Sequence, residues 1–180
     1  MAARPTLVPS ALSGDDVNKA TYSAWCSTYE RDCLEIGWSG PGRTVESIRS
    51  FCSAARCLRV LDVGCGTGWI GKELQECGFL QSQSRMCGFD LCQEMLDEAH
   101  NHRNGLYAEL VAHSVLQAPW PYESGSFDLV LSNGVLRYTD SEPGLVIGEI
   151  DRIAASDAHI VLQVTNILQV VQKGLHVHTC

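Results

Sequence analysis

The sequence predicts an α/β domain: a three-layer sandwich in which helices cover both faces of a mostly parallel sheet. Short apolar runs, such as 58–63 and 127–133, alternate with amphipathic stretches of helical length. Such alternation specifies βαβ units and a parallel sheet. The run 127–133 is almost continuously apolar, which is typical of a strand buried on both faces. A chain of 180 residues also suits one domain with a single core.

Charge and cysteine content exclude several classes of protein. The net charge is −8 and no basic stripe is present, so a nucleic-acid partner is disfavoured. The nine cysteines are scattered and form no CxxC or Cys/His ligand cluster, which predicts reduced thiols and no metal site. Residues 1–14 are expected to be a flexible leader without an apolar stretch for a signal or membrane span. We therefore expect a cytoplasmic protein, with the nucleus as the alternative, and no membrane contact.

The domain proper is expected to span 15–166, leaving 167–180 as a short C-terminal segment. A helix is predicted to begin between residues 13 and 16, with Tyr22, Trp25 and Tyr29 on one aromatic face. These rings suit packing on the core at least as well as a ligand role. A Gly- and Pro-rich loop over 37–42 should lead into a second helix at 44–55.

The rest of the chain is organised around 58–78, where an apolar strand breaks into three alternate glycines before a helix that ends near Gly78. Glycine accepts positive φ and lets a ligand lie directly against the backbone. Gly64, Gly66 and Gly68 are therefore interpreted as the floor of a nucleoside site. An ordinary strand-to-helix turn, the alternative, needs only one or two glycines.

Four more strands should follow, at 84–90, 107–114, 127–133 and 159–165, with helices at 91–102 and 141–155. Ligands of open parallel sheets bind beyond the carboxyl ends of the strands. The glycine loop, Asp90, Ser114 and Asn133 all lie at predicted carboxyl ends, so we expect them to converge on one crevice.

Asp90 lies 22 residues after Gly68, where a carboxylate can bind both hydroxyls of a ribose. The alternative, a helix N-cap, can coexist with that role. The loop reads G-x-G-x-G, whereas dinucleotide sites usually read G-x-G-x-x-G. Asp62, just before the loop, would be poorly placed beside a pyrophosphate and well placed beside an ammonium group. The ligand that fits has a ribose, an adenine and an amino-acid tail, without phosphate.

The segment "VLDVGCGTG", with Asp90 downstream, resembles motif I and the following acidic position of class I S-adenosylmethionine-dependent methyltransferases. "FDLVLSNGVL" resembles the fourth-strand motif of that superfamily, and "PWPYESGSFD" resembles the loop before it. The resemblance covers about 15–165. "TYSAWCSTYERD", "RDCLEIGW" and "NGLYAEL" narrow it to the methyltransferase-like proteins of the Williams–Beuren syndrome region. It implies a Rossmann-like sheet, with S-adenosylmethionine as cofactor and S-adenosylhomocysteine as product.

The resemblance also implies residue roles. Gly64, Cys65 and Gly66 would contact the methionine part through their backbone. Asp62 would orient its ammonium group, and Asp90 would hold the ribose.

On the adenine side, Leu91 would flank the ring. Many relatives carry an Asp after the third strand, where this chain has Ser114, so the contact would fall to the backbone N–H of Val115. Asn133 would lie near the methionine tail, and Tyr29 could close over it.

The function implied is methyl transfer to an unidentified small-molecule or protein acceptor. His113, Arg137 and Tyr138 are candidates for the substrate side, and no catalytic residue is assigned. A non-catalytic S-adenosylmethionine-binding protein is the alternative. A nicotinamide-dependent oxidoreductase is disfavoured by the glycine spacing and Asp62.

The C-terminal segment departs from the resemblance, which implies a further helix and an antiparallel strand pair. Only "NILQVVQKGLHVHTC" remains, and "LQVV" and "LHVH" predict a small hairpin or one added strand. The usual C-terminal strands are therefore expected to be missing or replaced. We expect a shortened form that binds cofactor, transfers methyl groups weakly or not at all, and self-associates through the incomplete sheet edge.

Overall fold

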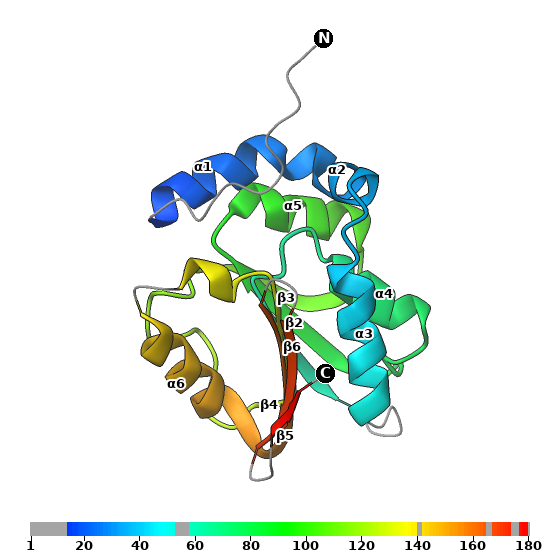
Figure 1. Ribbon diagram of the computed structural model, residues 1–180, viewed down its shortest axis with the longest axis vertical. Helices are drawn as coiled ribbons and strands as arrows, with labels where there is room; N and C mark the ends of the chain where they lie inside the picture. The colour runs from blue at the N-terminus through cyan, green and yellow to red at the C-terminus, as the bar shows by residue number, and fades with distance from the viewer. Residues whose placement is uncertain (1–13, 53–57, 140–141, 165–166, 174–176, 180) are drawn as a thin grey trace.

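The computed structural model describes residues 14–52, 58–139, 142–164, 167–173 and 177–179 (Figure 1). Their helices are α1 (Asp15–Trp25), η1 (Cys26–Thr28), α2 (Tyr29–Glu35), α3 (Gly40–Phe51), α4 (Trp69–Glu76), α5 (Gln93–His102), η2 (Leu136–Tyr138) and α6 (Pro143–Ile153). Their strands are β1 (Arg59–Val63), β2 (Arg85–Asp90), β3 (Tyr107–Ala112), β4 (Phe127–Asn133), β5 (Ala154–Val164), β6 (Ile167–Gln172) and β7 (Val177–Thr179).

One sheet connects all the described strands, in the order β3-β2-β1-β4-β5-β6-β7. The first five strands in this order are parallel, as the alternation of strands and helices predicts. The chain runs outward from β1 to β3 and then returns to the other side of β1 with β4. The strand order therefore reverses between β1 and β4, and this is the position where open α/β sheets bind ligands.

Apolar side chains on the two faces of the sheet form two cores. On one face, Ile48 of α3 and Leu74 of α4 pack with Val60 of β1. On the other face, Ile150 of α6 packs with Val130 of β4 and the same layer of strands. Figure 1 shows α3 and α4 on one side of the sheet and α6 on the other. The predicted three-layer sandwich is confirmed.

The N-terminal part differs from the prediction in two places. The single expected helix is interrupted by η1, which turns the chain between α1 and α2. The expected loop over 37–42 is wrong from Gly40 onward, because α3 already begins there with Pro41 in its first turn. Proline suits this position, since the first helical N–H groups have no partner within the helix. Expected helix residues 53–55 lie outside the described part of the chain, as does 1–13 of the expected leader.

The C-terminal segment forms strands. β6 pairs antiparallel with β5, and β7 pairs antiparallel with β6. Only two residues separate β5 from β6, so the helix that the resemblance implies is absent there and a hairpin takes its place. The small hairpin predicted for this segment is observed as β6 and β7. It brings the described sheet to seven strands, so the expectation that C-terminal strands are missing is wrong. In the part of the chain that the structure describes, none of the helices has the length and hydrophobicity needed to span a bilayer.

Truncating Leu74 should test the α3/α4 core. Leu74 is fully buried, so Leu74→Ala should lower the free energy of unfolding by about 2–5 kcal/mol through lost burial and a residual cavity. Urea denaturation measures this change. Gln75→Ala is the matched control, because Gln75 is exposed on the same helix. If the two variants unfold at the same urea concentration, the packing of Leu74 in this core is contradicted.

Candidate functional site

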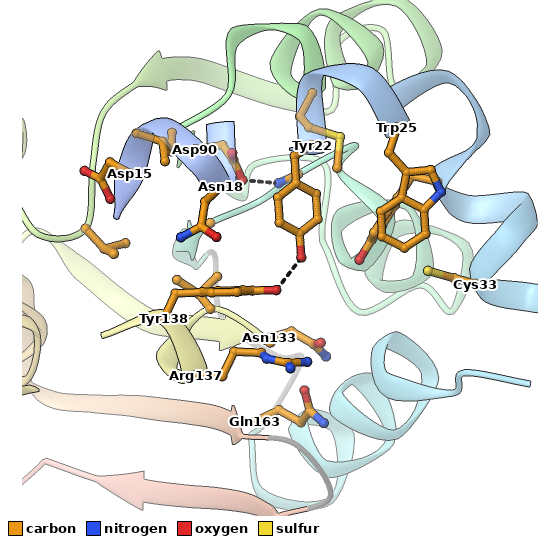
Figure 2. A pocket seen from close by; sticks show the side chains of 18 of the residues that line it. Asp15, Asn18, Tyr22, Trp25, Cys33, Asp90, Asn133, Arg137, Tyr138 and Gln163 are labelled. Carbon is orange, nitrogen blue, oxygen red and sulfur yellow. Dashed lines mark hydrogen bonds between the residues drawn. The ribbon is translucent and has the colours of Figure 1, made fainter. Parts of the chain in front are cut away.

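A cavity lies between the N-terminal helices and the carboxyl ends of the parallel strands (Figure 2). Its walls are formed by the N-terminal helices and by the segments that follow the parallel strands. The lining residues are Asp15, Asn18, Tyr22, Trp25, Tyr29, Cys33, Ile36, Trp38, Gly64, Gly66, Asp90, Leu91, Met95, Ser114, Val115, Asn133, Gly134, Val135, Arg137, Tyr138 and Gln163.

The glycine loop after β1 forms one wall of this cavity. Gly64 has φ 67°, and a Cβ on it would clash with the side chain of Val135, so only glycine fits. A Cβ on Gly66 would meet only Met95 Cε at 3.9 Å, so its backbone faces open space. Gly68 is different, because it packs against Tyr107 and does not line the cavity. The interpretation of all three glycines as the floor of the site is therefore wrong for Gly68.

Asp90 connects the end of β2 to the glycine loop. Its Oδ2 accepts a hydrogen bond from Gly66 N–H at 2.9 Å, and its Oδ1 accepts one from Cys92 N–H at 2.9 Å. Burial raises the pKa of this carboxyl, and the backbone N–H groups partly offset that effect. The helix N-cap is Cys92 and not Asp90, so the N-cap alternative is not observed. Asp90 instead fixes the shape of the loop and still faces the cavity.

Asp62, the last residue but one of β1, lies beneath the loop. Its side chain is 1% exposed, and its Oδ2 accepts a hydrogen bond from Tyr107 Oη at 2.8 Å. Burial raises the pKa of this carboxyl to about 7, while the Tyr107 hydroxyl lowers it and the charge of Asp90 raises it further. Asp62 and Cys65 are not among the residues that line the cavity.

The ends of β3 and β4 provide further lining. Ser114 Oγ accepts a hydrogen bond from Leu116 N–H at 3.0 Å, which holds the turn after β3. Asn133 Nδ2 donates to Thr44 Oγ1 of α3 at 2.7 Å. Asn133 Oδ1 is buried without a hydrogen-bond partner in the described part of the chain. A buried acceptor in this state favours a ligand that can donate a hydrogen bond.

Aromatic side chains of the N-terminal helices cover the cavity. Tyr22 Oη and Tyr138 Oη are 2.7 Å apart, which joins α1 to η2 across the cavity (Figure 2). The ring of Tyr29 lies 4.9 Å from that of Trp25 and 6.3 Å from that of Trp38, centroid to centroid. Burial raises the pKa of Tyr22 and of Tyr29, so both hydroxyls remain protonated donors.

A partly buried ion pair and a hydrogen bond connect α2 to the glycine loop and to the end of α5. Glu30 Oε1 accepts a hydrogen bond from Thr67 Oγ1 at 2.6 Å and pairs with the guanidinium of Arg103. Thr67 belongs to the loop, and Arg103 follows α5. The position of the aromatic cover is therefore coupled to the loop beneath it.

The structure brings together eight of the ten residues that the sequence predicts as cofactor contacts. These are Tyr29, Gly64, Gly66, Asp90, Leu91, Ser114, Val115 and Asn133. Of the substrate-side candidates, Arg137 and Tyr138 line the cavity, whereas His113 does not and hydrogen-bonds to Gln117 O.

Sequence reasoning missed several lining residues. Gln163 could have been found, because it lies at the carboxyl end of the fifth strand, where the same rule applies. Met95 lies in the first turn of α5, which begins two residues after Leu91. Asn18 and Trp38 carry no such signal, because their positions depend on how α1 and α2 fold over the sheet.

Comparisons with known proteins agree with this geometry. Residues 60–157 match the methyltransferase domain family. Methyltransferase-like protein 27 of Homo sapiens is 33% identical over 116 residues, which cover 64% of this chain and 45% of the relative. Malonyl-[acyl-carrier protein] O-methyltransferase of Legionella pneumophila is 32% identical over 142 residues, covering 77% of this chain and 46% of the relative. The chain thus spans about half the length of these two relatives.

Among solved structures, a methyltransferase of Haloferax volcanii, determined in complex with the Trm112 methyltransferase activator, has the same fold with a TM-score of 0.63. The two chains are 18% identical, and the match covers 78% of this chain and 58% of the other. The family match includes most of β1, the glycine loop, Asp90 and β4, which contribute to the wall of the cavity on the side of the sheet. The chain belongs to the methyltransferase domain family and has the class I S-adenosylmethionine-dependent methyltransferase fold.

Proposed function

We propose that this chain binds S-adenosylmethionine in the cavity and transfers its methyl group to an acceptor that enters beside Arg137 and Tyr138. The observation that carries the proposal is the convergence of Gly66, Asp90 and Asn133 on one cavity at the reversal of strand order. These residues offer the contacts that a nucleoside with an amino-acid tail requires.

The ribose would bind to Asp90. A carboxylate has about four lone-pair positions, and two of those on Asp90 are used by the N–H groups of Gly66 and Cys92. The remaining positions suit the two ribose hydroxyls. Leu91 would flank the adenine, and Ser114 and Val115 would lie along its edge. All three line the same cavity as Asp90.

The methionine tail would lie along Gly64 and Gly66. The space beside Gly66 is open to backbone contact, and the unpaired Oδ1 of Asn133 suits the ammonium group. The carboxylate of Asp62, beneath the loop, would attract the same ammonium group electrostatically without touching it. Tyr29 would cover the tail from α2.

S-adenosylmethionine supplies a methyl group activated by its sulfonium. The protein would contribute chiefly by aligning the acceptor with that methyl, an effect worth up to about 7–11 kcal/mol in well-oriented reactions. The rings of Tyr22, Trp25 and Tyr29 would exclude water and favour a cationic ligand through their faces. The name of the Legionella relative specifies an O-methyltransferase, which makes oxygen a reasonable acceptor atom here as well.

The Asp90 contact can be tested by changing both partners. Asp90→Ala should weaken binding of S-adenosylhomocysteine by about 1.5–3 kcal/mol, the range for hydrogen bonds to a charged group. Because Asp90 also holds Gly66, the 2′,3′-dideoxy analogue of the ligand should be titrated in parallel by calorimetry. Removing the hydroxyls should weaken binding to the wild type and have little further effect on the variant.

Asp97→Ala is the control, because Asp97 is exposed on α5 and does not line the cavity. If the loss of binding free energy caused by Asp90→Ala and the loss caused by removing the hydroxyls simply add together, the ribose contact is contradicted. Binding of S-adenosylhomocysteine without turnover on any acceptor would favour the non-catalytic alternative.

The charge of Asp62 predicts a pH dependence of binding. The pKa of its carboxyl is about 7 without ligand, and a nearby ammonium group would lower it. Binding would therefore release a proton below pH 7, and affinity should fall by up to about tenfold per pH unit as the pH drops from 7. Asp62→Asn should abolish this dependence.

The control ligand is 5′-methylthioadenosine, which lacks the ammonium group and should bind independently of pH in this range. Calorimetric titrations between pH 5.5 and 8 measure both ligands. If the affinity for S-adenosylhomocysteine changes with pH in the same way for the wild type and Asp62→Asn, Asp62 does not interact with the ammonium group and only supports the loop.

The helices α1 and α2 should behave as a lid. S-adenosylhomocysteine is expected to slow amide hydrogen exchange across residues 15–35, because the ligand adds contacts beneath Tyr22 and Tyr29. Tyr22→Phe removes the bond to Tyr138 and should speed exchange in α1 by about 2- to 10-fold in the free protein, as expected for one hydrogen bond. Lys19→Gln, a change at an exposed position of the same helix that does not line the cavity, should have no such effect. Equal protection with and without ligand would count against a lid.

A further inference from the structure

The end of the cavity away from Asp90 has its own chemistry. There the guanidinium of Arg137 lies beside the side chains of Asn133 and Gln163, below the bond between Tyr22 and Tyr138 (Figure 2). Arg137 Cζ is 5.3 Å from the centroid of the Tyr138 ring, a cation-π contact that orients the guanidinium. This group of side chains comes from the end of β4, the segment after it and the end of β5.

The charges on the cavity wall are separated in space. Of the described lining residues, Arg137 alone carries a positive charge, and the carboxylates are those of Asp15 and Asp90. Figure 2 shows Asp15 on the Asp90 side and Arg137 on the opposite side. Bringing a carboxylate into a partly buried site is costly unless a cation pairs with it. Arginine supplies that charge with two parallel donors.

The side chains that line the cavity also include few groups that could act as a general base and remove a proton from the acceptor. Burial raises the pKa of the Tyr22 and Tyr29 hydroxyls and raises the pKa of the Cys33 thiol to about 11. Of the two lining carboxylates, Asp90 already accepts hydrogen bonds from backbone N–H groups with both oxygens, and Asp15 lies on the Asp90 side, away from Arg137. An ammonium or alcohol acceptor would need to lose a proton to become a good nucleophile. A carboxylate at neutral pH is already deprotonated and needs no base.

We infer that the acceptor is a carboxylic acid, which Arg137 holds as its carboxylate and which leaves as a methyl ester. This inference rests on the proposed function. One carboxylate oxygen forms a bond to the methyl carbon as the carbon–sulfur bond breaks, and that electron pair stays on sulfur. The products are a neutral ester and a thioether, and no proton is transferred. The reaction pairs an anion with a sulfonium cation, so exclusion of water by the aromatic cover favours it.

Arg137 could instead bind the carboxylate of the methionine tail, and the two roles make opposite predictions for ligand binding. If Arg137 holds the tail, Arg137→Gln weakens S-adenosylhomocysteine but spares 5′-methylthioadenosine, which has no carboxylate. If Arg137 holds the acceptor, the affinities for both nucleosides stay within about twofold of wild type.

The test uses protein saturated with S-adenosylhomocysteine and three probes with the same aromatic body: phenylacetate, phenylacetamide and 2-phenylethylammonium. An aromatic body suits the walls formed by Trp38 and Tyr22. Phenylacetate should bind more tightly than the other two by calorimetry or ligand-observed NMR. Arg137→Gln should weaken phenylacetate by about 10- to 100-fold, as expected for loss of a charge-assisted contact, and Arg137→Lys should recover part of that loss.

Arg49→Gln is the matched control, because Arg49 is exposed on α3 and does not line the cavity. With S-adenosylmethionine in place of the product, the wild type should form methyl phenylacetate, whose methyl group is released as methanol by mild base. The inference would be overturned if phenylacetate binds no better than phenylacetamide. It would also be overturned if mild base does not release the transferred methyl group as methanol. Failure of S-adenosylhomocysteine to bind the wild type would instead overturn the proposed function.

Discussion

The hydrogen bond from Gly66 N–H to Asp90 is the interaction on which the site depends. It joins the loop after β1 to the end of β2, so that two segments 24 residues apart form one surface. The N–H groups of Gly64 and Cys65 donate to Phe89 O and hold the start of the same loop. Only glycine fits at position 64, because Val135 of the β4 side fills the space beside it. The loop is thus fixed from both sides and leaves its Gly66 backbone facing the cavity.

The aromatic cover is built on that loop. Glu30 bonds to Thr67 and pairs with Arg103, so α2 is attached to the glycine loop and to the end of α5. Trp25 is oriented by the bond from its Nε1 to Asp32, within the same part of the chain. A ligand that displaces the loop would therefore also shift the cover. This coupling gives a physical basis for ordering of α1 and α2 when the cavity fills.

Most of the sheet could be predicted from the sequence, because the periodicity of apolar residues and the spacing of the glycines can be read from neighbouring positions in the chain. The strand 127–133 is observed with the predicted bounds, and the positive φ of Gly78 was expected at a helix end. The burial of Asp62 against Tyr107 could not be predicted, since that contact joins residues 45 positions apart and depends on strand order. The same holds for Tyr22 and Tyr138. The start of α3 at Gly40 was missed because glycine and proline usually indicate a loop, whereas proline fits the first helical turn.

A crystal structure with S-adenosylhomocysteine tests most directly how the ligand lies on this sheet. The ribose hydroxyls should lie within hydrogen-bonding distance of Asp90, the amino-acid tail should lie along Gly64 and Gly66 with its ammonium group near Asn133, and Arg137 should face the space beyond the sulfur. A nucleoside bound elsewhere, or bound in this cavity with its ribose away from Asp90, would contradict the account.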